Sequence, residues 1–198
     1  ATEALQGPMA RDTGDLALFL DAMTGWDPRM PISLPAPPVP FLAAWDSAPG
    51  AIRLAFSEDQ GGFAPVEREV RATLRRAMRR AESAGAEVRE ACPELPDLAE
   101  TYLTLRGMHY GAVIGALPDE VRAAFKDTLR TNMEQGLALT AEAIFRAMRR
   151  RGDLYERMRL FLQGVDALAL PVTGVVPGPV EEEYPPAVAG EPVADYVD

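Results

Sequence analysis

The sequence predicts an α/β fold, in which a few mostly parallel strands pack against helices. Residues 51–57 and 86–92 are short runs with apolar side chains, of the kind that form buried strands. Between them, residues 65–84 carry apolar side chains in steps of four and arginines on the other side, which indicates an amphipathic helix ended by Gly85. Together they predict a βαβ unit with a right-handed crossover.

The first fifty residues are expected to add a helix and an extended connector. Asp12 is a suitable N-cap, and Asp15 stands at the third helical position, where an acid favours the exposed amides. We expect this helix to end at Gly25. The connector over residues 26–40 contains six prolines, which favour an extended surface segment. The apolar residues expected to attach it to the core are Phe41, Leu42 and Trp45.

Beyond Cys92 the pattern becomes mainly helical. The predicted elements are a helix capped by Asp97, a short helix after Pro118, a long helix over residues 132–150 that Gly152-Asp153 breaks or bends, and a helix over residues 154–162. A third buried strand is predicted over residues 166–170, ended by Pro171. The tail, rich in Pro, Gly and Glu, is expected to be extended. We expect residues 1–198 to form a single domain.

Composition excludes several classes of partner. A net charge of −10 argues against nucleic acids and anionic membranes, which need basic surfaces. No apolar run approaches the roughly 20 residues that span a bilayer. The single cysteine excludes an internal disulfide framework and favours a cytoplasmic protein. Because the chain starts at Ala1 without a methionine or a secretory signal, we expect a fragment or a processed chain.

The residue types that most often carry chemistry are scarce. His109, the only histidine, falls on the apolar stripe of its predicted helix, where a hydrogen-bonded core histidine is the usual finding. Cys92 ends a strand, where a buried and inert thiol is the usual finding. A Cys92–His109 nucleophilic pair is kept as a less favoured alternative. No metal-ligand spacing occurs, so we expect neither a metal nor another cofactor.

Two further features have simple structural explanations. The Gly61-Gly62 loop precedes a helix and is therefore a candidate anion site. It lacks the G-x-G-x-x-G and P-loop patterns, and the neighbouring Glu58 and Asp59 would repel phosphate, so a plain turn is expected. The arginine clusters of residues 71–80 and 149–151 are expected to face solvent and form surface ion pairs.

An ordered set of motifs resembles the amidase signature family, most closely its bacterial members related to the A subunit of aminoacyl-tRNA amidotransferases. Residues 7–11 (GPMAR) and 15–23 (DLALFLDAM) resemble that family's turn and following helix. The further matching stretches, in the same order, are residues 57–62 (SEDQGG), 65–71 (PVEREVR), 85–88 (GAEV), 132–136 (NMEQG), 166–173 (DALALPVT), 184–185 (YP) and 190–196 (GEPVADY).

The resemblance implies hydrolysis of carboxamide bonds in the complete protein. Family members use a Ser–cis-Ser–Lys triad and backbone amides that stabilise the oxyanion, all from a Gly/Ser-rich signature upstream of the Gly-Pro-Met turn. This sequence has one lysine, Lys126, and four serines, none of them in a Gly-Gly-Ser-Ser context. We therefore expect no catalytic residue here and an inactive isolated chain that resembles the middle-to-late part of an amidase.

The same resemblance implies a role in substrate binding. By position, Asn132, Pro171, Val172 and Thr173 are candidates for the wall of a pocket that takes a small amide substrate, although a helix start and a strand end would explain them equally well. The sequence departs from the family pattern at Val172 and Gly174, where Thr and Pro are frequent. The alternative function is a non-catalytic binding or scaffold module, which would oligomerise or dock on a partner through an exposed apolar surface.

Overall fold

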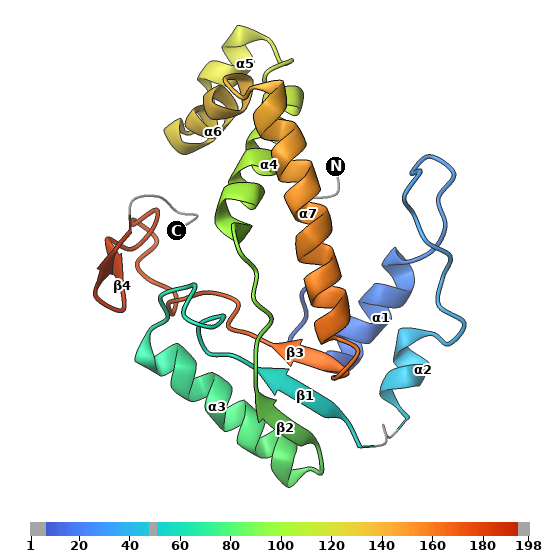
Figure 1. Ribbon diagram of the computed structural model, residues 1–198. Helices are drawn as coiled ribbons and strands as arrows, with labels where there is room; N and C mark the ends of the chain where they lie inside the picture. The colour runs from blue at the N-terminus through green and yellow to red at the C-terminus, as the bar shows by residue number, and fades with distance from the viewer. Residues whose placement is uncertain (1–6, 48–50, 194–198) are drawn as a thin grey trace. The chain divides into compact units, whose positions relative to one another are not determined.

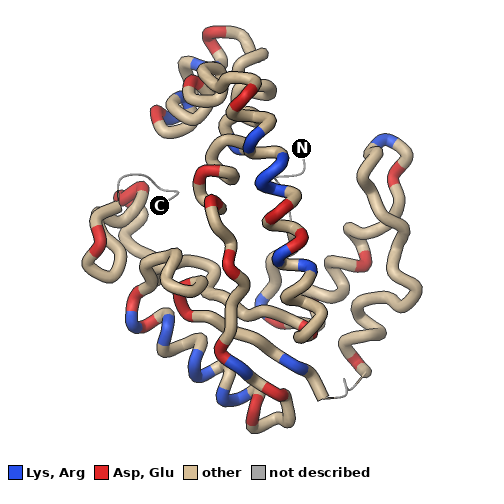
Figure 2. Tube along the Cα trace, viewed as in Figure 1, with Lys and Arg blue, Asp and Glu red and all other residues tan. Residues whose placement is uncertain are grey.

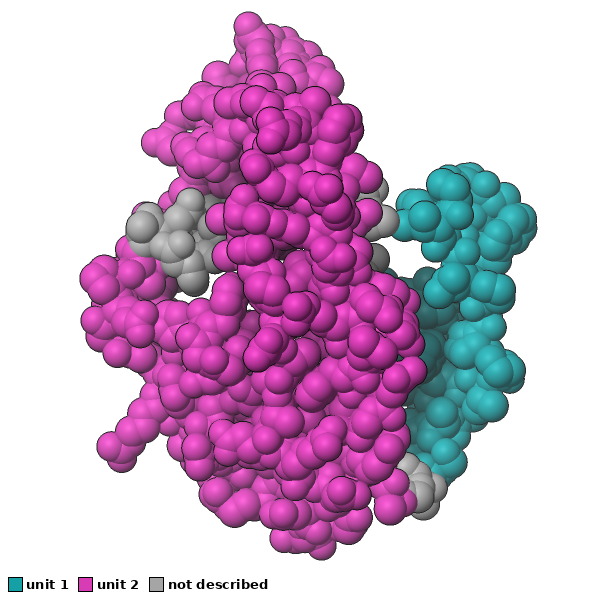
Figure 3. All heavy atoms as spheres, viewed as in Figure 1, with its two compact units in different colours: residues 1–50 teal, residues 51–198 magenta. Residues whose placement is uncertain are grey.

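A computed structural model describes residues 7–47 and 51–193 of the chain. These ranges contain seven helices and five strands (Figure 1), so the α/β fold expected from the sequence is confirmed. The chain divides into two compact units, residues 1–50 and 51–198, which Figure 3 colours separately. All described strands belong to the second unit. The expectation of a single domain over residues 1–198 stays a prediction.

The first unit contains two helices and the proline-rich connector. Helix α1 (Thr13–Met23) follows Asp12, whose carboxylate accepts a hydrogen bond from the Asp15 amide at 2.9 Å. The predicted N-cap is therefore confirmed. The predicted stop at Gly25 is confirmed: α1 ends at Met23, Thr24 is its C-cap, and Gly25 follows with a φ of +141°.

Helix α2 (Phe41–Trp45) begins where the connector ends and is held to α1 by polar contacts. The carboxylate of Asp21 accepts hydrogen bonds from the first two amides of α2, at 2.6 and 3.0 Å. It thereby provides the cap that the preceding proline cannot. The indole nitrogen of Trp45 donates to the hydroxyl of Thr13 at 2.8 Å. The three residues expected to attach the connector thus all lie in α2, which docks on α1.

The second unit is built on a parallel sheet with the strand order β2-β1-β3 (Figure 1). Each strand is shorter than its predicted run: β1 spans Arg53–Phe56, β2 spans Glu87–Glu90 and β3 spans Ala167–Ala169. In β1, the central strand, Leu54 stands opposite Val88 on one side and Ala167 on the other. The adjacent Ala55 is completely buried, as expected for the middle of a parallel sheet.

Helix α3 (Arg68–Ser83) connects β1 to β2 and packs on β2 (Figure 1). It starts three residues after the predicted start at Pro65, because the backbone of Glu67 is still extended. Val66 therefore lies in the loop before the helix, where it is buried. The predicted helix stop is confirmed: Gly85 has a φ of +99°, within the left-handed region that glycine adopts just beyond a helix.

A reciprocal contact between Arg53 and Asp166 fixes the start of β1 beside the start of β3. The carboxylate of Asp166 accepts hydrogen bonds from the Arg53 guanidinium at 2.7 and 3.3 Å and from the Arg53 amide at 2.8 Å. The Asp166 amide donates to the Arg53 carbonyl at 2.8 Å. The side-chain hydrogen bonds from Arg53, followed by the one from its amide, lower the pKa of Asp166 to about 2.

Four helices lie between β2 and β3. They are α4 (Leu98–Val113), α5 (Asp119–Ala123), α6 (Asp127–Leu137) and α7 (Ala141–Phe161). The predicted single helix over residues 132–150 is wrong, because two helices meet there. Helix α6 ends at Leu137, and Thr140 caps α7 by accepting a hydrogen bond from the Ala143 amide. The predicted break at Gly152-Asp153 is also wrong, because α7 continues through both residues.

Helix α4 starts after Asp97 as predicted, but this residue does not act as a side-chain cap. Its backbone is left-handed, with a φ of 57°, and its carboxylate makes no hydrogen bond to the first turn. The carboxylate lies instead 3.3 Å from the guanidinium of Arg150, which also binds Glu100 at 2.6 Å. The acidic residues at the start of α4 therefore hold it to α7.

Helices α4 and α6 cross at backbone contact distance because glycines face one another. A Cβ atom added at Gly107 would lie 3.3 Å from the Cα of Gly136, and one added at Gly111 would lie 3.1 Å from the Gly136 carbonyl carbon. A Cβ atom added at Gly136 would overlap the carbonyl oxygen of Gly107. No side chain larger than hydrogen fits at Gly136 unless the two helices separate.

The tail after β3 contains a short hairpin that the sequence did not predict. Strands β4 (Ala187–Val188) and β5 (Glu191–Pro192) pair in antiparallel fashion. Ala189 and Gly190 join them with φ values of 51° and 87°, as in a two-residue type I′ turn. The tail is therefore partly folded rather than simply extended.

Much apolar surface of the described residues contacts solvent. No large side chain among them is completely buried, whereas Phe145 and Tyr155 on α7 are 68% and 70% exposed. None of the described helices is both long and apolar enough to cross a bilayer, and the longest, α7, carries charged residues along its length (Figure 2).

The glycine crossing predicts opposite effects of one substitution at two helical sites. Gly136→Ala should lower the free energy of unfolding by about 1–3 kcal/mol, because the new methyl group overlaps backbone. The control Gly152→Ala lies in open space within α7 and should raise it by up to about 1 kcal/mol. Urea unfolding at low protein concentration measures both; equal effects would contradict the close crossing.

The Arg53–Asp166 contact predicts a defined pH dependence. Because the pKa of Asp166 is lowered from 3.8 to about 2, its ionised form stabilises the folded state above the unfolded pKa. The stability difference between the protein and Asp166→Asn should be constant from neutral pH to about pH 5 and vanish as the pH falls through about 2. Arg53→Gln should give the same profile in urea titrations, and a difference that does not shrink between pH 5 and pH 2 would contradict it.

Candidate functional site

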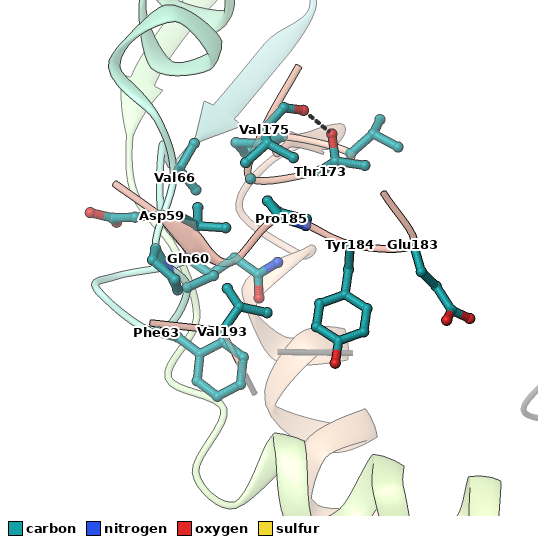
Figure 4. Close-up of a pocket in the computed structure, with 16 residues that line it drawn as sticks. Asp59, Gln60, Phe63, Val66, Thr173, Val175, Glu183, Tyr184, Pro185 and Val193 are labelled. Atoms are coloured by element: carbon teal, nitrogen blue, oxygen red, sulfur yellow. Dashed lines mark hydrogen bonds between the residues drawn. The ribbon is translucent and has the colours of Figure 1, made fainter. Parts of the chain in front are cut away.

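The carboxyl ends of β1 and β3 lie side by side, and a loop follows each strand. In open parallel sheets, ligands bind at this edge. The Ser57 amide donates to the Ala169 carbonyl at 3.2 Å and holds the two loops together at their origin. A pocket of about 600 Å³ lies between the loop after β1, the segment after β3 and the C-terminal tail (Figure 4).

The loop after β1 is a tight turn closed by its own side chains. Gln60, Gly61 and Gly62 all have positive φ values. The hydroxyl of Ser57 accepts a hydrogen bond from the Gly61 amide at 3.0 Å, and the carboxylate of Asp59 accepts one from the Gly62 amide at 2.9 Å. Both amides are thus used within the loop, which favours the plain turn over an anion site.

Two arginines of α3 bind the acidic residues of this loop. Arg75 binds both carboxylate oxygens of Glu58, whose side chain is almost completely buried. Arg71 lies 3.3 Å from the carboxylate of Asp59 and donates to the Val66 carbonyl at 2.8 Å. Both arginines therefore form ion pairs, as expected for this cluster, and stay partly exposed, at 52% for Arg75 and 36% for Arg71. They fix the loop against the first two turns of α3.

The segment after β3 places three of the four candidate binding residues on the pocket. Pro171, Val172 and Thr173 all line it. The side chain of Val172 is 99% exposed, so a valine stands at the pocket with no apolar neighbour covering it. The Thr173 hydroxyl donates to the Val175 carbonyl at 2.7 Å, which fixes the turn of the segment (Figure 4).

Gly174, one of the two departures from the family pattern, has a structural explanation. Its carbonyl accepts a hydrogen bond from the Glu67 amide at 2.8 Å, so the segment lies directly against the start of α3. A Cβ atom at Gly174 would lie 2.6 Å from the Pro65 carbonyl oxygen and 3.1 Å from a Val188 methyl group. Only glycine permits this approach.

The remaining lining residues were not identified from the sequence. Beyond the residues already named, the lining is formed by Phe63 and Ala64 from the first loop and by Glu183, Tyr184, Pro185 and Val193 from the tail (Figure 4). The loop residues follow a strand of a parallel sheet, a signal that could have identified them. The tail residues lie just before and just after the hairpin of β4 and β5, which the sequence did not predict.

Asn132, the fourth candidate, is not among the residues that line this pocket. It is buried on α6, where its amide group donates to the Thr128 carbonyl at 2.7 Å. Its carboxamide oxygen accepts a hydrogen bond from Arg106 at 3.3 Å. The guanidinium of Arg106 in turn lies over the rings of Tyr102 and Tyr110, at 5.8 and 4.8 Å from their centroids. Asn132 thus belongs to a polar contact between α4 and α6.

His109 and Cys92 have local contacts of a structural kind. The half-buried imidazole packs against Tyr110, with 5.7 Å between the ring centroids. The Cys92 thiol lies 3.6 Å from the Pro93 carbonyl oxygen, and burial raises its pKa. A raised pKa disfavours the thiolate that a nucleophilic cysteine needs. Neither contact supports a thiol–imidazole pair.

The charges at the pocket are largely paired. Asp59 faces Arg71, and Glu183 accepts a hydrogen bond from Thr128 at 3.0 Å while lying 3.6 Å from the ammonium of Lys126. Most of the other lining side chains are apolar or aromatic. Chemically, the site can surround an apolar or aromatic group, with the Gln60 amide and the Thr173 hydroxyl nearby for polar contacts.

Known proteins resemble this chain along almost its whole length. An acylamidase of Rhodococcus erythropolis is 27% identical over 195 residues, which cover 94% of this chain and 39% of that protein. An indoleacetamide hydrolase of Bradyrhizobium japonicum is 37% identical over 102 residues, half of this chain and 20% of that protein. The chain thus spans well under half the length of these curated relatives.

Solved structures share the fold. A bacterial aryl acylamidase of the amidase signature family superposes with a TM-score of 0.76 at 22% identity, covering 94% of this chain and 41% of that one. A 6-aminohexanoate cyclic dimer hydrolase superposes with a TM-score of 0.66 at 19% identity, covering 79% and 34%. The amidase family itself matches residues 1–196. The chain therefore belongs to the amidase signature family of hydrolases.

Proposed function

We propose that this chain is a portion of an amidase-signature hydrolase that cleaves carboxamide C–N bonds in a longer polypeptide. It contributes packing and one wall of the substrate pocket, but no catalytic triad. The observation that carries the proposal is the pocket at the carboxyl ends of β1 and β3, in a chain of amidase ancestry.

The names of the relatives support a small amide as substrate. They include an acylamidase and an indoleacetamide hydrolase, and one matched structure is a 6-aminohexanoate cyclic dimer hydrolase complexed with substrate. The apolar and aromatic lining of the pocket suits an uncharged acyl or amine group of such an amide.

The contacts of the serines and of the lysine support the absence of a triad. The Ser57 hydroxyl accepts the Gly61 amide in the turn after β1, and the Ser83 hydroxyl donates to a carbonyl of its own helix. Ser33 and Ser47 likewise bond to nearby backbone in the first unit. Lys126 faces Glu183. A nucleophile needs an adjacent base, and these contacts describe structural roles instead.

The four candidate binding residues differ in whether their position supports a contact with the substrate. Pro171, Val172 and Thr173 stand at the pocket and would contact the substrate directly. A substrate contact by Asn132 stays a prediction, because the buried side chain bonds within the α4–α6 pair. No metal or other cofactor enters this proposal.

A second candidate function is a non-catalytic binding or scaffold module. The observation that favours it is the exposed apolar surface on α7 and at Val172. Such a module would oligomerise or dock on a partner through that surface. A cytoplasmic location stays a prediction from the single cysteine.

The isolated chain should not hydrolyse amides. We expect no release of aniline from a simple acyl anilide above the buffer rate, because none of the four serines stands in the Gly/Ser-rich signature that carries the family's triad. A fusion that places the Gly/Ser-rich signature region of an amidase ahead of this chain should restore hydrolysis. Hydrolysis by the 198 residues alone that a serine-directed inhibitor abolishes would contradict the proposal.

The same fusion tests the pocket. Val172→Asp should raise KM at least about tenfold with a smaller change in kcat, because it places a charge where the substrate's apolar group would bind. The matched control is Val180→Asp, which changes an equally exposed valine of the tail outside the pocket. Equal KM values for the two variants would contradict the pocket assignment.

A further inference from the structure

Gln60 stands at the pocket on a loop that is closed on both sides of it. The Ser57 hydroxyl and the Asp59 carboxylate accept hydrogen bonds from the two glycine amides that follow Gln60, at 3.0 and 2.9 Å. The carboxylate of Asp59 is also held by an arginine of α3. The backbone that carries Gln60 is thus held in one conformation.

This conformation is one that favours glycine. Gln60 has a φ of 54°, in the left-handed region, where a residue with a Cβ atom is strained. The next two residues of the loop are also left-handed, and both are glycines. Residues held in such backbone are concentrated at functional sites. A role for the Gln60 side chain would explain why the loop carries strain here that glycine would avoid.

The side chain of Gln60 reaches into the pocket. Its carboxamide extends from the loop toward Tyr184 and Pro185 of the tail (Figure 4). Gln60 is half-buried, and its carboxamide makes no hydrogen bond to any residue within 7–47 and 51–193. A partly desolvated amide that keeps its donor and its acceptor available is suited to bind a ligand.

The chemistry of Gln60 differs from that of the other polar groups at the pocket. The hydroxyl of Thr173 already donates to the Val175 carbonyl. The carboxylates of Asp59 and Glu183 each face a cation. Gln60 is uncharged and offers an N–H donor and a carbonyl acceptor side by side. The group that satisfies both at once is another amide, which presents the same pair in reverse order, whereas a ketone or a carboxylate can only accept.

We propose that Gln60 is a specificity-determining residue, which selects substrates that carry a second, uncharged carboxamide on the apolar or aromatic group bound in the pocket. The proposal rests on the proposed function, since it takes the pocket as the substrate site. Gln60 binds and orients the substrate there and takes no part in cleaving the C–N bond.

Binding of three probes that differ in one group tests this selection. The probe para-acetamidobenzamide carries the second carboxamide, para-acetamidoacetophenone has a methyl group in place of its amino group, and para-acetamidobenzoate carries a charge. Titrations are followed by the shifts of the Gly61 and Gly62 amides in the isotope-labelled chain. The dissociation constant of the first probe should be at least about fivefold lower than those of the other two, a ratio that one neutral hydrogen bond supplies.

Gln60→Leu should remove this preference, because leucine keeps the apolar bulk but neither hydrogen-bonding group. The matched control is Gln163→Leu, the same change at an exposed position outside the pocket, which should leave the preference intact. Equal dissociation constants for the three probes would overturn this proposal and leave the pocket in place. No binding of any probe would overturn the pocket as well. An inactive fusion with the probe preference intact would count against the proposed hydrolysis alone.

Urea unfolding separates recognition from packing. Gln60→Gly should remove the probe preference and leave the unfolding midpoint unchanged or raise it, because glycine relieves the left-handed strain. The matched control is Ala189→Gly, at a second left-handed residue, with a φ of 51°, that does not line the pocket. It should have a similar effect on the midpoint and none on the preference. A clear fall in the midpoint for Gln60→Gly alone would assign the side chain to packing and overturn the proposal.

Discussion

The structure of the second unit depends on the pairing of β3 with β1, two strands separated by more than a hundred residues. The hydrogen bonds between Arg53 and Asp166 hold the amino ends of these strands together, and the Ser57 amide holds their carboxyl ends at Ala169. Between the two strands the chain forms α3, β2 and four further helices. Bringing together two strands so far apart in the sequence has a loop-closure cost. The contacts made by the whole intervening segment offset this cost, so the sheet and the helices depend on one another for stability.

The pocket follows from this pairing. Parallel strands end at the same edge, so the loop after β1 and the segment after β3 must leave the sheet together. Arg71 and Arg75 then fix the acidic loop, and the hydrogen bond between Glu67 and Gly174 fixes the second segment against it. The lining between them is mainly apolar and aromatic.

Local signals predicted the βαβ unit, the Asp12 cap and the Gly85 stop, because each depends on residues near in sequence. The break before Thr140 and the continuous α7 were missed. Thr140 is a typical cap residue, and Gly152 does not break α7, because one glycine is tolerated in a long helix. The hairpin at Ala189 was not readable, because alanine seldom adopts a positive φ. Pro171, Val172 and Thr173 were placed at a pocket by family resemblance, whereas Asn132 bonds inside a helix pair that spacing does not reveal.

The most direct test of this account is the register of β1 and β3, measured by nuclear Overhauser effects in the isotope-labelled chain. Backbone contacts should join Leu54 to Ala167 and Phe56 to Ala169, and methyl contacts should join Val66 to Val175 across the pocket. Their observation in a parallel pattern would support both the sheet and the pocket. An antiparallel pattern, or no contact between the two strands in a folded chain, would contradict the architecture on which the proposed pocket depends.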